Sequence, residues 1–162
     1  QGLQVANFAN AFGMKVIAWS HNLKQEDCIN ANVEYVSSTE WLKLSDISTI
    51  HTKLSDRTIG FVDKKKLKLM KKDALIVNTS RGPIIRETDL IEALKKQDIG
   101  GAALDVFDIE PLPQMHPLRE IKNVILTPYI GSISSEAYQL FFNGYIIAIK
   151  VFLDGNSINQ IN

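Results

Sequence analysis

Cysteine is nearly absent from this chain of 162 residues, which contains only Cys28. A single cysteine excludes a disulfide within the chain and supplies no thiolate cluster for a metal, so we expect a reducing compartment, the cytoplasm. An excess of charge of one sign is also lacking, because 18 Lys and Arg residues balance 18 Asp and Glu residues. Without a strong electric field, the chain is expected to bind neither nucleic acid nor an anionic membrane.

Long apolar runs are absent as well. The most apolar stretch, "YIIAIKVFL", is interrupted by Lys150 and is too short to span a bilayer. The opening "QGLQVANFANAFGM" has neither the basic start nor the continuous apolar centre of a signal peptide. The whole chain is 45% hydrophobic and 22% charged. This composition is typical of a globular chain that can bury a substantial core.

Two kinds of apolar pattern alternate along the chain. Short runs rich in β-branched residues predict strands at 15–20, 47–52, 74–80, 101–107 and 123–127. Helical patterns are present at 38–45, 63–72, 86–97 and about 134–154, and at the start, where Val5, Phe8, Ala9 and Phe12 share one face. Ser38 and Asp63 are predicted to begin helices, and Gly155 to follow the end of one. Strands alternating with helices predict an α/β fold with a parallel sheet, and nearly continuous apolar strands predict helices on both faces.

Polar side chains gather where the predicted strands end. Ligands bind at the carboxyl ends of the strands in parallel α/β sheets. The residues at these ends are Ser20, His21, Asn22, Thr52, Lys53, Thr79, Ser80, Arg81, Gly82, Asp105, Thr127, Pro128 and Tyr129. Glu110 lies just beyond, in the proline-rich segment 108–118. A guanidinium, carboxylates and a phenol at one edge predict a binding site there.

Three motifs, "NTSRGPIIRETDLIEAL", "GGAALDVFDIEPLP" and "NVILTPYIG", follow one another along the chain. In this order and spacing they resemble the nicotinamide-binding domain of the D-isomer-specific 2-hydroxyacid dehydrogenases, and the likeness extends from Gly2 to the C-terminus. The resemblance implies a doubly wound, Rossmann-like parallel sheet. It also implies an oxidoreductase that uses NAD or NADP to move a hydride to or from C2 of a small 2-keto or 2-hydroxy acid, and a homodimer.

The resemblance assigns chemistry to three residues. Arg81 would bind and polarise the keto acid, Glu110 would support the acid/base, and Tyr129 occupies the position of the family's acid/base histidine. Simpler interpretations are that Arg81 is a surface cation and Glu110 a solvated loop acid. Tyr129 would then be a packing or substrate-contact residue. A phenol has a pKa near ~10 and an imidazole near ~6.5, so a phenol is a far poorer base at neutral pH. His116 is the one nearby histidine that could substitute, although a surface histidine is the simpler interpretation.

The resemblance also implies a set of cofactor contacts. These are Gly2, Ser20, His21, Asn22, Thr52, Thr79, Ser80, Asp105 and Gly131. Asp105 would form a hydrogen bond with the nicotinamide carboxamide or, alternatively, cap its own loop. The strand-end acid that would hold the adenosine ribose is replaced by Ser20, 18 residues after Gly2. Ser20, His21, Asn22 and Lys24 could accept a 2′-phosphate instead, so NAD and NADP both stay open. No metal is predicted.

The start of the chain departs from the family pattern. Gly2 matches only the last glycine of G-x-G-x-x-G, and neither the preceding central strand nor the first part of a substrate domain has a counterpart. We therefore expect a fragment, with a partial dinucleotide-binding domain at 1–133 and a helix and tail at 134–162 that return to the substrate domain in full-length relatives. The place of the absent strand should be filled or closed, because buried backbone groups need partners. The alternative function is a non-catalytic nucleotide-binding or dimerisation module.

Overall fold

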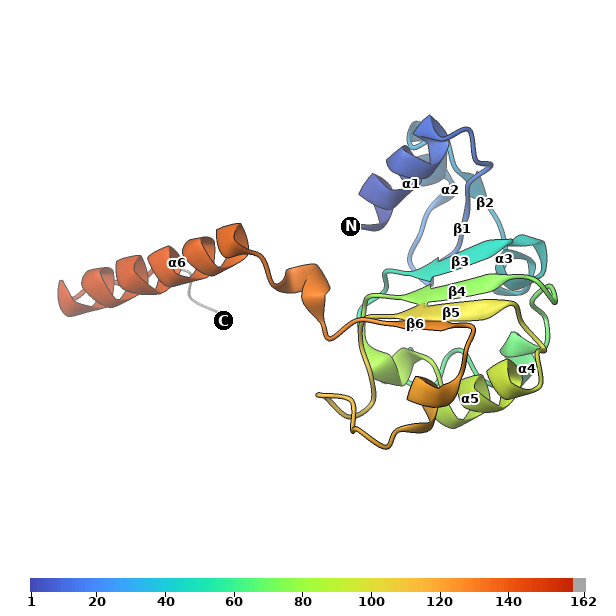
Figure 1. The fold of residues 1–162 in the computed structure, drawn as a ribbon. Helices are drawn as coiled ribbons and strands as arrows, with labels where there is room; N and C mark the ends of the chain where they lie inside the picture. Colours follow the sequence, from blue (N-terminus) through green and yellow to red (C-terminus); the bar gives the residue numbers. More distant parts are fainter. Residues whose placement is uncertain (159–162) are drawn as a thin grey trace. The chain divides into compact units, whose positions relative to one another are not determined.

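The computed structural model describes residues 1–158. The chain divides into two compact units, Gln1–Pro128 and Tyr129–Asn162, which are described separately. In the first unit strands alternate with helices (Figure 1). The elements are α1 Gly2–Ala11, β1 Ile17–Ala18, α2 Gln25–Asn30, β2 Glu34–Tyr35, α3 Ser38–Leu44, β3 Ile47–Ile50, α4 Lys64–Leu67, β4 Leu75–Asn78, η1 Gly82–Ile84, α5 Glu87–Lys95, β5 Gly101–Leu104, η2 Pro117–Glu120 and β6 Val124–Leu126. Every strand and helix expected in this part of the chain is present, and α2, β2 and the short helices η1 and η2 are additional.

The strands form two parallel sheets. Four of them pair in the order β3-β4-β5-β6, with Leu75 beside both Ile47 and Gly101. The strands β1 and β2 pair only with each other, so no described strand joins the two sheets. Parallel strands linked by helices confirm the α/β class. The expected filling of the absent strand's place by a partner chain or by domain swapping stays a prediction, and among the described residues the strands form two separate sheets. Because β1 and β2 are short and none of their residues is buried, water can satisfy their unpaired backbone groups.

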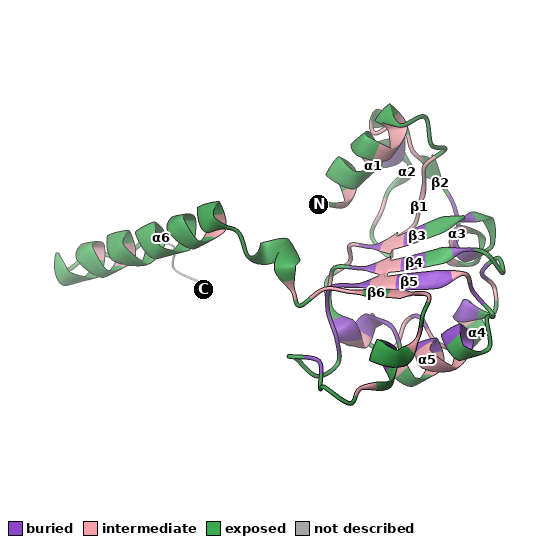
Figure 2. Ribbon diagram, in the orientation of Figure 1, coloured by how far each residue is buried: buried purple, intermediate pink, exposed green. Residues whose placement is uncertain are grey.

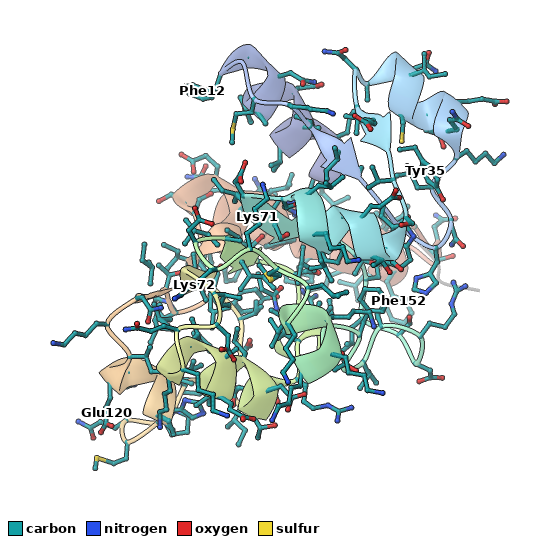
Figure 3. All side chains as sticks on the ribbon, turned by 90° about the vertical axis from the view of Figure 1, so that its right-hand side faces the viewer. Phe12, Tyr35, Lys71, Lys72, Glu120 and Phe152 are labelled. Carbon is teal, nitrogen blue, oxygen red and sulfur yellow. The ribbon has the colours of Figure 1, made fainter. Side chains whose placement is uncertain are left out.

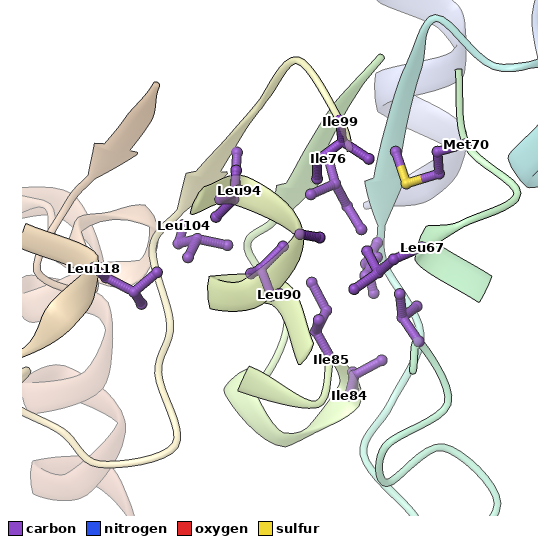
Figure 4. Close-up of a cluster of buried hydrophobic side chains, with 14 of the residues drawn as sticks. Leu67, Met70, Ile76, Ile84, Ile85, Leu90, Leu94, Ile99, Leu104 and Leu118 are labelled. Atoms are coloured by element: carbon purple, nitrogen blue, oxygen red, sulfur yellow. The ribbon is translucent and has the colours of Figure 1, made fainter. Parts of the chain in front are cut away.

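The main core lies on one face of the four-stranded sheet. The helices α4 and α5 lie along this face (Figure 1), and their side chains interlock with those of the strands (Figure 4). Leu67 from α4 and Leu90 from α5 meet Ile76 from β4, and all three are 0–2% exposed. Each such side chain contributes roughly 1.5–3 kcal/mol of hydrophobic stabilisation. This packing holds the carboxyl ends of the strands at fixed positions.

Within the first unit, no helix covers much of the opposite face of the same sheet (Figure 2). Ile47, Leu75 and Ile125 are 47%, 42% and 68% exposed. This differs from the expectation of helices on both faces. The predicted apolar stripe of α1 is also not buried, because no residue of that helix is buried and Phe12, at its end, is 85% exposed (Figure 3). Apolar strand composition alone therefore did not determine which faces would be covered.

Helix starts in the first unit follow from side-chain caps. The Ser37 hydroxyl accepts a hydrogen bond from the Glu40 N–H at 3.2 Å, and the Ser37 N–H donates to the Glu40 carboxylate at 2.9 Å. This reciprocal capping box places the cap of α3 at Ser37, one residue before the predicted Ser38. The prediction for α4 is confirmed, since the Asp63 carboxylate accepts from the Lys66 N–H at 3.0 Å, which lowers the pKa of Asp63.

The second unit contains the short helix η3, Ile130–Ser132, and the long helix α6, Ser135–Leu153. The Ser134 hydroxyl caps α6 by accepting from the Ala137 N–H at 3.1 Å, and Gly155 ends it at a φ of 77°. No residue of α6 is buried. Among the residues described, no helix is both long enough and apolar enough to cross a membrane. Residues 159–162 of the predicted tail lie outside the described residues.

Candidate active site

The turn after β4 is built around a buried amide. Asn78 is 1% exposed, and its Nδ2 donates to the Arg81 carbonyl at 2.9 Å while its Oδ1 accepts from the Ser80 N–H at 3.1 Å. The Ser80 hydroxyl in turn donates to the Thr52 carbonyl at 2.5 Å, which ties this turn to the end of β3. The structure thus brings the predicted residues Thr52, Thr79, Ser80 and Arg81 to neighbouring strand ends. Sequence reasoning assigned no role to Asn78.

Arg81 presents its guanidinium to solvent. Its Nη1 donates to the Ser80 carbonyl at 2.6 Å. Within residues 1–158, no carboxylate lies at ion-pair distance from it. A guanidinium that is exposed and lacks an acidic partner can form a bidentate bond with a carboxylate ligand.

The end of β5 holds a buried carboxylate. Asp105 is 5% exposed, and the Thr127 hydroxyl donates to its Oδ1 at 2.5 Å. The backbone is fixed on both sides, because the Asp105 N–H donates to the Asn78 carbonyl and the Thr127 N–H donates to the Leu104 carbonyl, each at 3.0 Å. A buried carboxylate is costly unless it is hydrogen-bonded. These bonds keep Asp105 at the carboxyl edge of the sheet.

Glu110 folds back over its own loop. Its Oε1 accepts from the Phe107 N–H at 2.9 Å, although the residue itself is exposed. The proline-rich segment is held further along by Arg119, which donates to the Leu112 carbonyl at 2.9 Å and to the Pro113 carbonyl at 3.0 Å. The loop that carries Glu110 is therefore fixed by its own backbone and by η2.

Gly82 brings the two loops into direct contact. A Cβ at this position would lie 2.1 Å from the Phe107 carbonyl carbon and 2.6 Å from the Asp108 nitrogen. Only a residue without a side chain permits this approach. The loop that bears Arg81 consequently packs against the loop that bears Glu110.

His116 is engaged on both ring nitrogens. Its Nδ1 accepts from the Leu118 N–H at 3.3 Å, so Nε2 carries the proton and donates to the Glu87 carboxylate at 3.0 Å. Burial raises the pKa of the nearby Asp108, and the charge of Glu87 raises it further, while His116 opposes the shift. Since both nitrogens have structural partners, His116 is not placed as a substitute acid/base.

Tyr129 and Gly131 belong to the second unit. Tyr129 has a φ of 58° and a ψ of 39°, the left-handed conformation, and directly precedes η3. A bulky residue in this region is an outlier, whereas histidine is among the residues found there more often. Backbone outliers of this kind cluster at functional sites. Gly131 lies within η3 and is exposed.

A second group of predicted residues lines a cavity of about 350 Å³. Its lining consists of Ser20, His21, Asn22, Thr52, Lys53, Leu54, Ser55, Arg57 and Thr58. Sequence reasoning missed Ser55, Arg57 and Thr58, although their position shortly after a predicted strand could have indicated them. Gly2 opens α1 near the end of β3, where a Cβ would lie 3.5 Å from that of His51, an ordinary contact that does not require glycine.

The turn around Asn78 yields a testable prediction. Asn78→Ala should lower the free energy of unfolding by about 2 kcal/mol, because the turn loses the two hydrogen bonds that the buried Asn78 amide makes to the Ser80 and Arg81 backbone. Urea denaturation followed by circular dichroism measures this change. Thr79→Ala, at the exposed neighbouring position, is the matched control and should change stability by less than ~0.5 kcal/mol. Equal losses in the two variants would contradict the role of the amide.

A parallel α/β sheet with polar loops gathered at the carboxyl ends of its strands defines a dinucleotide-binding domain of the Rossmann type. The pattern of the family described as "D-isomer specific 2-hydroxyacid dehydrogenase, NAD binding domain" matches residues 1–131. The chain belongs to this family, which confirms the resemblance inferred from the three motifs.

Known relatives agree with this assignment. The chain is 44% identical over 135 residues to a glyoxylate reductase of Aeropyrum pernix, covering 83% of this chain and 40% of that protein. A D-lactate dehydrogenase from Sporolactobacillus sp. has a similar structure, with a TM-score of 0.85 and 34% identity over 99% of this chain and 52% of that one. An acyclic imino acid reductase in complex with NADPH and D-Arg has a TM-score of 0.78 and 34% identity over 99% of this chain and 50% of that one. The chain thus spans about half the length of these proteins, or less.

Proposed function

We propose that this chain is part of an NAD(P)-dependent oxidoreductase that transfers a hydride between nicotinamide and C2 of a small 2-keto or 2-hydroxy acid. The observation that carries the proposal is the exposed Arg81 guanidinium, which has no acidic partner among the described residues. It stands on a loop packed against the loop of Glu110. The identity of 44% to a glyoxylate reductase supports a small 2-keto acid as substrate.

The residues suit the groups that this reaction requires. Arg81 binds the substrate carboxylate and polarises the C2 carbonyl, so that negative charge developing on its oxygen is stabilised. Asp105, which is held by Thr127, would accept a hydrogen bond from the carboxamide of the bound cofactor. The nicotinamide, when bound, supplies or accepts the hydride. Glu110 is proposed as the residue that supports the acid/base, and Tyr129 is proposed for the acid/base position, as the family resemblance implies.

A non-catalytic nucleotide-binding module is the second candidate. It is favoured by Tyr129, since a phenol is a poor proton acceptor at neutral pH. Both candidates require the cofactor site, and only the first requires Arg81.

Two measurements on the chain separate these functions. We expect NADH or NADPH to bind in calorimetric titration, and glyoxylate, hydroxypyruvate or pyruvate to be reduced with loss of absorbance at about 340 nm. Arg81→Gln should lower kcat/KM by about 10²-fold, because one stabilising cation is lost, and should leave cofactor affinity unchanged. Arg86→Gln, at an exposed arginine nearby, is the matched control and should retain activity. Binding without turnover would favour the module, and no binding at millimolar cofactor would refute both functions.

Assembly and location are part of the same proposal. We infer a homodimer, supported by the exposed apolar side chains of α6, such as Phe141 and Ile149, which are 57% and 58% exposed. We also infer a cytoplasmic location. The single cysteine, Cys28, supports it, since this residue is buried and free and burial raises the pKa of its thiol.

A further inference from the structure

The cavity at the ends of β1 and β3 is positively charged. Two of its lining residues, Lys53 and Arg57, are cations, and none of the lining residues is an acid. Within the described chain neither cation forms an ion pair. Asp56, which lies between them in sequence, is exposed and does not line the cavity. The cavity therefore favours a ligand group that carries negative charge.

The turn that carries both cations is held rigidly. Thr58 is 5% exposed, and its hydroxyl donates to the Lys53 carbonyl at 2.8 Å and accepts from the Ser55 N–H at 2.8 Å. These bonds close the turn from Lys53 to Thr58 and place the two cations on it. A closed turn reduces the entropy lost when a ligand binds.

The part of the cavity lining that follows β1 is fixed by aromatic packing. The Trp19 ring stacks on Phe61 with centroids 5.0 Å apart and an interplanar angle of 9°. The His21 ring packs against both, with centroid distances of 4.8 Å to Trp19 and 5.7 Å to Phe61. His21 and its neighbours Ser20 and Asn22 thus offer an imidazole, a hydroxyl and an amide at a defined edge.

Ser20 stands where an acid would favour NAD over NADP. In folds of this type, a carboxylate at this strand end bonds the adenosine ribose hydroxyls of NAD, and its charge would repel a 2′-phosphate. Here the position holds a neutral hydroxyl next to a cavity with two cations. We propose that Lys53 and Arg57 bind the 2′-phosphate of the adenosine ribose, and that the chain selects NADP(H) over NAD(H). This inference rests on the proposed cofactor site and specifies its ligand.

The adenosine end can be tested without the nicotinamide. Calorimetric titration with 2′,5′-ADP and with 5′-AMP compares ligands that differ only in the 2′-phosphate. We expect 2′,5′-ADP to bind at least about tenfold more tightly, because hydrogen bonds between a cation and a phosphate are stronger than neutral ones. The preference should weaken as salt concentration rises.

Variants assign the preference to the two cations. In Lys53→Gln/Arg57→Gln the ratio of the two affinities should fall to about one, with 5′-AMP binding unchanged and the circular dichroism spectrum preserved. Lys122→Gln, at an exposed lysine outside the cavity, should keep the full ratio. The proposed preference for NADP(H) would be overturned if the unmodified chain bound the two ligands equally or bound neither. If the double variant kept the ratio of the two affinities, Lys53 and Arg57 would not be the residues that bind the 2′-phosphate. If the chain preferred 2′,5′-ADP but transferred no hydride, the proposed oxidoreductase activity would be refuted and the proposed 2′-phosphate site would stand.

Discussion

Gly82→Ala is expected to lower the free energy of unfolding by about 3 kcal/mol, the upper part of the range for overpacking. The added methyl group would lie 2.1 Å from the Phe107 carbonyl carbon and 2.2 Å from its oxygen. Both atoms are backbone, so a change of side-chain rotamer cannot relieve the clash, and one of the two loops must move. Urea denaturation measures the loss of stability.

A matched substitution distinguishes the clash from a general effect of removing glycine. Gly144 lies inside α6, and a Cβ there would have no neighbour within 4 Å. Gly144→Ala should therefore stabilise its helix, by roughly 0.5–1 kcal/mol. If Gly82→Ala unfolded at the same urea concentration as the unmodified chain, the close contact between the loops of Arg81 and Glu110 would be disproved.

Under the proposed oxidoreductase function, Tyr129→His is expected to raise kcat/KM for 2-keto acid reduction by about 10²-fold or more. An imidazole exchanges protons readily near neutral pH, and a positioned acid/base contributes 10²–10⁴-fold to a rate. The backbone favours the exchange, since position 129 has a φ of 58°, a conformation that histidine adopts more readily than a bulky residue. Steady-state kinetics with NADPH and glyoxylate measure the gain.

The role of the phenol itself is tested by a second substitution. If Tyr129 is a packing residue, Tyr129→Phe should keep the activity of the unmodified chain, because the ring is retained. Tyr138→His is the matched control, since it introduces a histidine at another tyrosine of the same unit and should leave kcat/KM unchanged. Loss of activity in both Tyr129→Phe and Tyr129→His would instead identify the phenol as a working acid/base.

The order of strands and helices could be predicted because most of them carry strong local patterns. The run "LIVN" of β4 and the capped start of α4 at Asp63 are examples. The two-residue strand β2, Glu34–Tyr35, could not be predicted, since it has no room for a periodic pattern and neither residue is buried. The split between the two sheets was also not predictable, because it depends on which strands find partners and not on local propensity.

The candidate site was predicted in part. Residues such as Thr52 and Arg81 were indicated because they follow apolar strands, and the fold brings such ends to one edge. Asn78 was overlooked because it belongs to the strand itself, and its function depends on the geometry of the turn that follows. Arg57 was overlooked because it lies in a loop whose closure by Thr58 becomes visible only in three dimensions.

The two sheets need not unfold together. The smaller one, with α1 and α2, buries few side chains, among them Cys28 and Val36, whereas the larger one carries the main core. Regions with few buried contacts open locally at a lower free-energy cost than the core. The cavity takes Ser20 and His21 from the weaker part and Lys53 and Thr58 from the stronger part. A nucleotide bound at the proposed site would contact both parts and stabilise the folded form of the weaker part by mass action, so local opening of this part should become rarer as the cofactor concentration rises.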